Sequence, residues 1–404
     1  MTKSPQRICL VAVNYFPEVT GCAPYTTDLA QRLVEAGNDV TVITALPHYP
    51  QWQIPVEYKT KDRRKELLNG VKVLRCAIYV PRKMSALARV AFEASFLLSA
   101  WWRSRAIKAD LVVAVSPALA DIVVGARLAK RLKVSYGVLV QDLMTAATTQ
   151  SNISGGNKVA GLASAIESRY LRKADSVAAI TESFSKSIRD LGVKAELVTV
   201  SPNYSVHNIV RMTRQSAREH LGWPQETFIL THTGNMGLKQ DLGNLIESIK
   251  LVDADNVKLL LVGDGSQRSE LVELAGANPK IEFMGLVSDE DYSALLSATD
   301  VLLLNEAPTI IDMSLPSKLT AYEASGRPIL GAVVPGGNTS KVLASLPNAT
   351  QVVAGEPEIL AQKISQLVAA GPVTTALETA ESESDNAKLR NTRIAWVQSL
   401  LPRP

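Results

Sequence analysis

Short runs of apolar residues alternate with segments of helical period along almost the whole chain. The runs are rich in Val, Ile and Leu, which is typical of strands that are buried on both faces of a parallel sheet. Strands that alternate with helices predict a doubly wound parallel α/β architecture. In the first half we expect strands at 8–13, 39–44, 71–76, 110–116, 135–140, 176–180 and 196–201, and helices at 25–36, 85–107 and 118–132 and before 173 and 191.

A second series of strands follows a polar stretch. Residues 202–226 contain no strand pattern and one short helical segment, so we place a domain boundary there. The second series is expected at 228–233, 257–262, 281–284, 301–305, 328–334 and 351–354. We therefore expect an N-terminal Rossmann-like domain over 1–206, a C-terminal one over 207–373 and a closing helix over 374–404, with a packing role for Trp396.

Composition narrows the class of protein. A chain of 404 residues exceeds what one core usually supports, and 46% hydrophobic with 20% charged residues is typical of a folded globular protein. A net charge of +4 is too slight for a nucleic-acid-binding protein. The three cysteines form no CxxC pair or zinc-ligand spacing, so we expect neither disulfides nor zinc, and a reducing cytoplasm is the simplest location.

The membrane relationship is expected to be peripheral. The first apolar run ends at polar Asn14 without a small-residue cleavage site, and no stretch reaches the ~20 uncharged residues that span a bilayer. However, the segment 82–108 has an apolar stripe with basic residues at both ends. This pattern fits a helix at an anionic membrane surface and equally a helix that covers a sheet. The stripe is Leu87, Val90, Ala91, Ala94, Leu97, Leu98 and Trp101, and the flanking charges are Arg82, Lys83, Arg103, Arg105 and Lys108.

Four loops follow apolar strands of the second half, where an open parallel sheet places its ligand. In THTGNMGLKQD, Gly234 and Gly237 allow a bend at the strand end, and Lys239 offers an ammonium to a pyrophosphate. In LPSKLTAYEASG, Ser317 and Lys318 stand at an expected helix N-terminus, which could bind an anion. The alternatives are a solvated surface lysine and an ordinary helix start.

The loop strings, together with NYFPEVTGCAPYTTDLAQRLVEAGNDVTVIT, ALPHYPQWQ and ITESF, resemble the retaining GT-B glycosyltransferases of family 4, in particular bacterial polysaccharide-assembly enzymes. The resemblance covers nearly the whole chain. It implies two Rossmann-like domains that face each other across a cleft, with the nucleotide-sugar donor bound by the C-terminal domain. It also favours approach of the diphosphate to Gly21, in the loop after the first strand.

The resemblance implies further donor contacts and two departures from the family. Relatives carry an Arg or similar group where Asn235 stands, so the diphosphate clamp is either one charge short or completed by Lys318. Of two family carboxylates eight positions apart, Glu323 matches the second, at the ribose, and Leu315 replaces the first, so Asp312, Ser314 or a backbone amide would contact the sugar. The base side of the pocket would be lined by Gly263, Gly265, Leu286 and Val287.

Acceptor-side candidates lie in the first half. His48 in a loop and Asp142 after a strand are candidate catalytic groups beside Lys239, since each could orient the acceptor hydroxyl or take its proton. No metal is expected, because Asp253 and Asp255 fall at the strand end opposite the cleft. No other cofactor is expected either.

The sequence thus predicts an enzyme that transfers a hexose or deoxyhexose from a nucleoside diphosphate to a saccharide acceptor, which we expect to be lipid-linked, with retention. The protein would be cytoplasmic and peripheral on the inner face of the cell membrane. A nucleotide-sugar 2-epimerase of the same architecture and a non-catalytic saccharide-binding relative are the alternatives.

Overall fold

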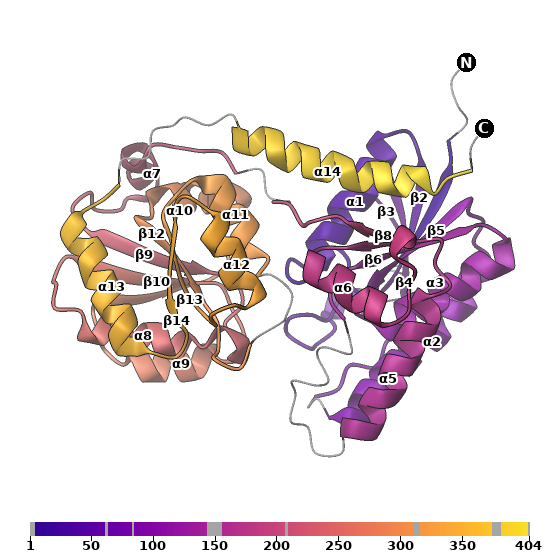
Figure 1. Cartoon of the computed structure of the whole chain (residues 1–404), viewed down its shortest axis with the longest axis horizontal. Helices are drawn as coiled ribbons and strands as arrows, with labels where there is room; N and C mark the ends of the chain where they lie inside the picture. Colours follow the sequence, from indigo (N-terminus) through magenta and orange to yellow (C-terminus); the bar gives the residue numbers. More distant parts are fainter. Residues whose placement is uncertain are drawn as a thin grey trace. The chain divides into compact units, whose positions relative to one another are not determined.

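The computed structural model describes residues 5–60, 64–82, 85–143, 156–206, 209–310, 316–373 and 381–402. Two compact units make up the chain, Met1–Asn203 with Lys388–Pro404, and Tyr204–Ala387. Each unit has a largely parallel sheet with helices on both faces (Figure 1). Both Rossmann-like folds that the alternating pattern predicts are therefore present.

The first unit contains an eight-stranded sheet in the order β3-β4-β2-β1-β5-β6-β7-β8. All seven strands expected from the sequence form, and their neighbours pair in parallel. The strands are β1 (Arg7–Val11), β2 (Asp39–Ala45), β3 (Lys65–Leu68), β4 (Val71–Cys76), β5 (Leu111–Ser116), β6 (Ser135–Val140), β7 (Ser176–Ala179) and β8 (Val198–Val200).

The edge strand β3 corrects the expectation of a purely parallel sheet. It pairs with β4 in antiparallel register, and Asn69 and Gly70 between them both have positive φ, at 50° and 79°. Asn-Gly is the preferred pair for a two-residue hairpin turn of this kind. The four residues of β3, Lys-Glu-Leu-Leu, show no alternation of polar and apolar positions, so the sequence carries no strand signal there.

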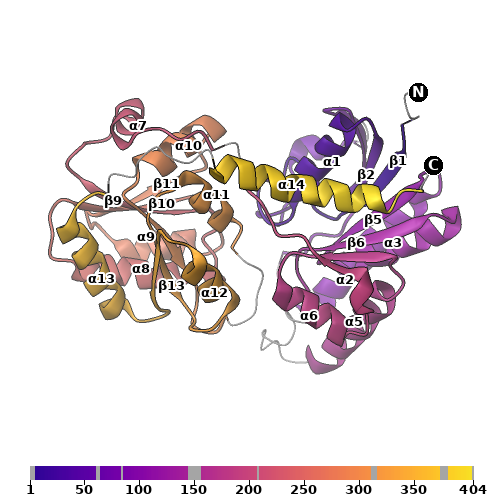
Figure 2. The same cartoon turned by 45° about the horizontal axis from the view of Figure 1, so that its top comes forward.

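Alternate residues of the central strands point to opposite faces of the sheet, so the first unit has two hydrophobic cores, one on each face. One face is covered by α2 (Ala86–Ser104), α3 (Leu119–Leu132), α5 (Gly156–Leu171) and α6 (Glu182–Asp190), and the other by α1 (Ala23–Glu35) and α14 (Glu381–Ser399) (Figure 2). The C-terminal part of α14 thus completes the core of a unit formed mainly by the start of the chain. Short 3-10 turns occupy Val56–Tyr58 and Ala195–Leu197.

The packing role expected for Trp396 is confirmed. Its side chain is 6% exposed, belongs to the core of the first unit and donates a hydrogen bond from Nε1 to Ser176 Oγ at 2.9 Å. A Cβ on Gly137 in β6 would lie 2.7 Å from Leu400 Cδ1. The absence of a side chain at Gly137 therefore lets the end of the chain approach the sheet. Arg393 adds hydrogen bonds to the backbone at the end of β8, at Ser201 and Pro202.

The second unit contains a six-stranded, fully parallel sheet in the order β11-β10-β9-β12-β13-β14. All six expected strands form. They are β9 (Phe228–Thr233), β10 (Val257–Val262), β11 (Ile281–Met284), β12 (Val301–Asn305), β13 (Ile329–Val333) and β14 (Ala349–Val353).

Helices again cover both faces of this sheet. One core includes α8 (Leu242–Leu251), α9 (Arg268–Ala275) and α13 (Pro357–Ala370), and the other includes α10 (Asp289–Ala298), α11 (Lys318–Ser325) and α12 (Asn338–Ser345). The short helix α7 (Arg214–Leu221) precedes β9 and packs on α10. The 3-10 turn Leu238–Gln240 lies in the loop after β9.

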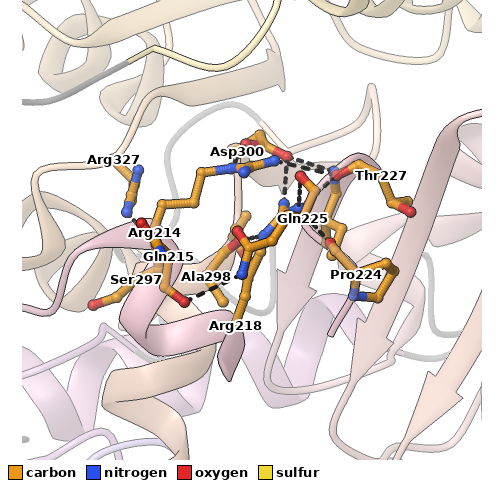
Figure 3. Close-up of polar contacts among 12 residues, drawn as sticks. Arg214, Gln215, Arg218, Pro224, Gln225, Thr227, Ser297, Ala298, Asp300 and Arg327 are labelled. Carbon is orange, nitrogen blue, oxygen red and sulfur yellow. Dashed lines mark hydrogen bonds and ion pairs between the residues drawn. The ribbon is translucent and has the colours of Figure 1, made fainter. Parts of the chain in front are cut away.

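A buried charge network ties α7 to the amino ends of β9 and β12 (Figure 3). Asp300 accepts from Arg218 Nη2 at 2.7 Å, from Arg214 Nε at 2.6 Å and from the backbone N–H of Ile229 at 2.7 Å. Arg218 is fully buried and also donates to the carbonyls of Pro224, Gln225, Thr227 and Ala298. The buried charges are therefore paired and hydrogen-bonded, which is the condition under which a protein interior tolerates them.

The loops after β9 and β10, at the carboxyl ends of the strands of the same sheet, contact each other through their backbones. Gly234 N–H donates to Val262 O at 2.8 Å, and Met236 N–H donates to Asp264 O at 2.9 Å. A Cβ on Gly263 would lie 2.1 Å from Gly234 O, and one on Gly265 would lie 2.4 Å from Met236 O. Only glycine at these two positions lets the loops approach so closely.

Replacing Asp300 with Ala should lower the free energy of unfolding of the second unit by about 3–5 kcal/mol, because two arginines would lose their buried counter-charge. Urea denaturation would measure the change. The matched control is Glu282→Ala, which removes the exposed partner of Lys258 and should cost less than about 1 kcal/mol. Equal losses in the two variants would contradict a central role for Asp300.

Replacing Gly263 with Ala should lower the unfolding free energy by about 2 kcal/mol or more, since the new methyl group meets a backbone carbonyl and the φ of +130° disfavours a side chain. Thermal or urea denaturation would measure it. Gly285→Ala is the control, because Gly285 also follows a strand but a Cβ there has no neighbour within 4 Å. A Gly263 variant as stable as the Gly285 variant would show that the two loops can separate.

Candidate functional site

The candidate residues fall into two groups, each at the carboxyl ends of the strands of one sheet. Gly234, Lys239, Gly263 and Lys318 belong to the second unit, whereas His48 and Asp142 belong to the first. Loops at the carboxyl ends of parallel strands are the usual ligand-binding position in this class of fold. The sequence-based choice of these loops therefore fits the observed topology.

Side-chain amides hold the loop after β9 in shape. Gln240 Oε1 accepts from the N–H of Gly237 at 3.1 Å and from Asn235 Nδ2 at 3.2 Å. Asn305, at the end of β12, donates to the carbonyls of Gln240 and Asp241, both at 2.8 Å. Asn235 thus has a structural partner within its own loop, and a contact to the diphosphate stays a prediction.

Lys239 is exposed on this ordered loop. Its carbonyl accepts the N–H of Ala307 at 2.9 Å, so the backbone is tied to the segment after β12 while the side chain extends into solvent. An exposed lysine on a fixed backbone can reach an anionic ligand at modest entropic cost. The same description also fits a surface lysine, the alternative considered above.

Lys318 lies deeper, as the first residue of α11. Its Nζ is 2.7 Å from His232 Nε2, and an ideal Cβ on Gly234 would lie 3.8 Å from the same Nζ. Burial lowers the pKa of Lys318 to about 7, while the carboxyl of Glu306 acts in the opposite direction. Neither His232 nor Glu306 was named as a candidate from the sequence. His232 occupies one position of the buried strand β9, so the local pattern does not mark it as a site residue.

The remaining donor candidates of the second unit differ in exposure. Ser317 is exposed just before α11, and its side chain does not cap the helix. Tyr322 in the same helix is buried, and its hydroxyl accepts the N–H of Thr233 at 2.9 Å. Leu286 is 63% exposed, whereas Val287 is partly buried against the core, and the contact of either residue with a nucleobase stays a prediction. Glu323 lies on the exposed side of α11, and Asp312, Ser314 and Leu315 lie outside the described residues.

In the first unit, Glu18 organises the loop that carries His48. Its Oε1 accepts the backbone N–H of His48 at 2.7 Å and of Tyr49 at 2.9 Å, and the carboxylate is buried. Sequence reasoning passed over Glu18, although it stands in the NYFPEVTG string. Gly21, with φ of +66°, follows it at the start of α1 and lies beside the Tyr49 ring.

His48 is more enclosed than a free catalytic base would be. The residue is 2% exposed, Nδ1 lies 2.9 Å from Leu46 O, and the ring packs against Trp52 and Phe92. The contact with a carbonyl requires a proton on Nδ1, which also lies 3.4 Å from Glu18 Oε1. Its catalytic role stays a prediction, and its packing role is evident.

Asp142 follows β6 in a half-buried position. Its Oδ1 accepts the N–H of Leu143 at 2.9 Å, and its carbonyl accepts from Ser116 Oγ at 2.7 Å. Gln141 beside it accepts from Asn203 Nδ2 at 2.9 Å. Nearby Asp121, at the start of α3, accepts the N–H of Val13, and burial raises its pKa well above the usual range.

Asp253 and Asp255, which were set aside as metal ligands on sequence grounds, are both exposed. Asp253 and Asp255 precede β10 at the amino end of the sheet, away from the candidate loops. Asp291 lies in the first turn of α10, where Ser288 is the N-cap and accepts its N–H at 3.1 Å. Within the described ranges, no group of three or more His, Cys, Asp or Glu side chains is placed to hold a metal ion.

Helix α2 has two apolar faces. Phe92, Phe96 and Ala100 enter the core, and Leu97 packs against it. The opposite face is exposed, with Leu87 at 82%, Leu98 at 66% and Trp102 at 67%, and it also includes Val90, Ala91 and Ala94. Arg82, Arg105 and Lys108 are exposed at its ends, and Lys83 lies outside the described residues. No helix in the described part of the chain combines the length and the hydrophobicity that crossing a bilayer requires.

Comparison with known proteins assigns both halves to glycosyltransferases. Residues 20–204 match the glycosyl transferase 4-like domain, and residues 227–370 match glycosyl transferases group 1. The chain is 32% identical over 333 residues to the putative colanic acid biosynthesis glycosyl transferase WcaI of Escherichia coli, covering 79% of this chain and 81% of that protein. It is 24% identical over 240 residues to the lipopolysaccharide core biosynthesis glycosyltransferase LpsE of Rhizobium meliloti, covering 58% and 66%.

Solved structures agree on the fold. Anabaena HepE in complex with UDP-glucose superposes with a TM-score of 0.68 at 18% identity, covering 98% of this chain and all of that one. Sucrose-phosphate synthase from Thermosynechococcus elongatus gives 0.69 at 17% identity, covering 98% and 95%. With two parallel-sheet α/β domains, matches of both halves and a relative at 32% identity, the chain belongs to the glycosyltransferases of the GT-B fold with a family 4-like N-terminal domain.

Proposed function

We propose that this glycosyltransferase moves a hexosyl or deoxyhexosyl group from a nucleoside diphosphate to a saccharide during assembly of a cell-surface polysaccharide, with retention at the anomeric carbon. The assignment to polysaccharide assembly follows the relatives WcaI and LpsE. The observation that carries the donor class is the meeting of Gly234 and Lys318 at the carboxyl end of β9. A lysine Nζ there lies beside a residue without a side chain, which suits the approach of a diphosphate.

The chemistry that this arrangement supports is stabilisation of the leaving group. As the glycosidic bond to the phosphate breaks, negative charge develops on the departing diphosphate, and fixed cations lower that barrier directly. Lys239 and Lys318 are the candidate cations, and no protein nucleophile and no metal ion are part of the proposal. Asp142 or His48 would orient the acceptor hydroxyl or take its proton.

A lipid-linked acceptor is part of the proposal and is supported by α2. The exposed stripe Leu87, Leu98 and Trp102 is apolar, and the exposed charges at its ends are basic. A single helix with this arrangement suits the boundary between acyl chains and anionic headgroups. We therefore propose that the protein is cytoplasmic and binds the inner face of the membrane through 82–108.

Replacing Lys239 with Ala should reduce kcat by about 10²–10³-fold, because a cation that faces developing charge contributes mainly in the transition state. The measurement is transfer from UDP- or GDP-sugars to a membrane-extract acceptor, after a thermal-shift panel of UDP, GDP, ADP and CMP has identified the base. Lys258→Ala, in the amino half of β10, is the control and should keep full turnover. Full activity of the Lys239 variant would exclude its role, and NMR of the product would establish the anomeric configuration.

The double variant Leu98→Ala and Trp102→Ala should lose most of its flotation with liposomes that contain anionic lipid, since it removes two of the largest exposed apolar side chains of α2. Leu67→Ala is the matched control, because Leu67 is 70% exposed on β3, outside this helix. Absence of flotation in the parent protein, or equal flotation in all variants, would remove the membrane proposal and leave the transferase reaction untouched.

A further inference from the structure

A half-hidden group of titratable side chains lies at the carboxyl end of β9. His232 is fully buried in β9, and its Nε2 is 2.7 Å from Lys318 Nζ. Glu306 follows β12, is 8% exposed and accepts from Thr339 Oγ1 at 2.6 Å. Three separate elements thus bring an imidazole, an amine and a carboxyl group to one place.

The amine of this group lies at the position proposed for the donor diphosphate. An ideal Cβ on Gly234 would be 3.7 Å from Lys318 Cε and 3.8 Å from Nζ, so the amine flanks the backbone of the loop after β9. Lys318 is also the first residue of α11, and the positive end of a helix disfavours an ammonium in the absence of an anion. An anion that entered here would reverse this preference.

The surroundings of Lys318 keep the amine close to losing its proton. Among the described residues, the titratable groups that face it are His232 from β9 and Glu306 from the segment after β12, while Thr339 from α12 carries no charge. Burial lowers the pKa of Lys318 to about 7, against the opposing effect of Glu306. Burial and the neighbouring Lys318 hold the pKa of His232 well below its usual range, so the imidazole is neutral at neutral pH.

We propose that Lys318 is a proton-linked anchor for the donor diphosphate and that His232 is the residue that positions it. In the free enzyme the amine is held against the neutral imidazole. When the diphosphate enters beside Gly234, the amine takes a proton from solvent and binds the phosphate oxygens as an ammonium. This inference rests on the proposed function, because it assumes that the ligand is a nucleoside diphosphate sugar.

The expected pH dependence has a definite sign. A bound diphosphate favours the ammonium and therefore raises the pKa of Lys318 above the value of about 7 in the free enzyme. Between the two pKa values the complex holds more protons than the separate partners, so binding takes up a proton. The Kd for the donor should be lowest below about pH 7 and rise up to about tenfold per pH unit above it.

Titration calorimetry with UDP-glucose and GDP-mannose tests this directly. Neither sugar nucleotide titrates near about pH 8, so repeating the titration there in buffers of different ionisation enthalpy counts the protons taken up by the protein. For the parent enzyme we expect an uptake that approaches one proton per ligand. Lys318→Arg should bind with no uptake and a flat pH profile, because an arginine keeps its charge throughout. Lys239→Met should bind more weakly and keep the uptake.

His232 is tested by two variants with different capacity to hold the amine. His232→Gln places an amide where Nε2 lies and should keep the parental uptake and pH profile. His232→Ala removes the partner and admits water, so the pKa of Lys318 should return toward its ordinary value and the uptake should disappear. A purely structural role of His232 would instead lower the melting temperature and leave proton uptake at full size in whatever fraction remains folded.

The outcomes separate this inference from the proposed function. Binding without proton uptake in the parent enzyme, or uptake that persists in Lys318→Arg, would overturn the inference and leave the donor class standing. Uptake of full size in folded His232→Ala would overturn the positioning role. If neither sugar nucleotide bound the parent enzyme, the proposed donor class would fall, and the inference would fall with it.

Discussion

The candidate donor site depends on a contact between two backbones. Gly263 and Gly265 bring the loop after β10 against the carbonyls of the loop after β9, at distances that no side chain permits. The hydrogen bonds across this contact fix Gly234 and Met236. The loop after β9 in turn carries Lys239 and borders Lys318. These two glycines, chosen from the sequence as ligand-lining residues, therefore have a structural requirement that is sufficient to explain their identity.

In the second unit, the partners of the buried charges differ between the two ends of the sheet. At the amino ends, Asp300 is matched by Arg214, Arg218 and a backbone N–H, so every charge has a partner and the network serves to attach α7. At the carboxyl ends, Lys318 has a neutral imidazole as its nearest neighbour. Glu306 offsets only part of the cost of burying this cation, since the pKa of Lys318 is lowered to about 7, and a perturbed buried cation of this kind is a candidate position for a ligand of opposite charge.

In the first unit, candidate functional residues also have structural roles. Glu18 and the aromatic rings around His48 hold the loop after β2 in place, so the residue selected for its imidazole also has a clear structural role. Helix α2 packs its phenylalanines against the sheet. Its opposite face exposes an apolar stripe with basic residues at both ends. The sheet-covering explanation therefore applies to one face of the helix, and the membrane explanation stays a proposal for the opposite, exposed face.

The sequence by itself determined both sheets, all thirteen expected strands and the loops that follow them, because buried parallel strands are continuous apolar runs bounded by glycine and polar residues. It missed β3, whose signal was the Asn69-Gly70 turn, because a short charged edge strand has little apolar periodicity. Tertiary structure alone decided that the end of the chain returns to complete the first core and that His232 meets Lys318. Each of these depends on contacts between residues distant in sequence or on burial, and local pattern carries no information about either.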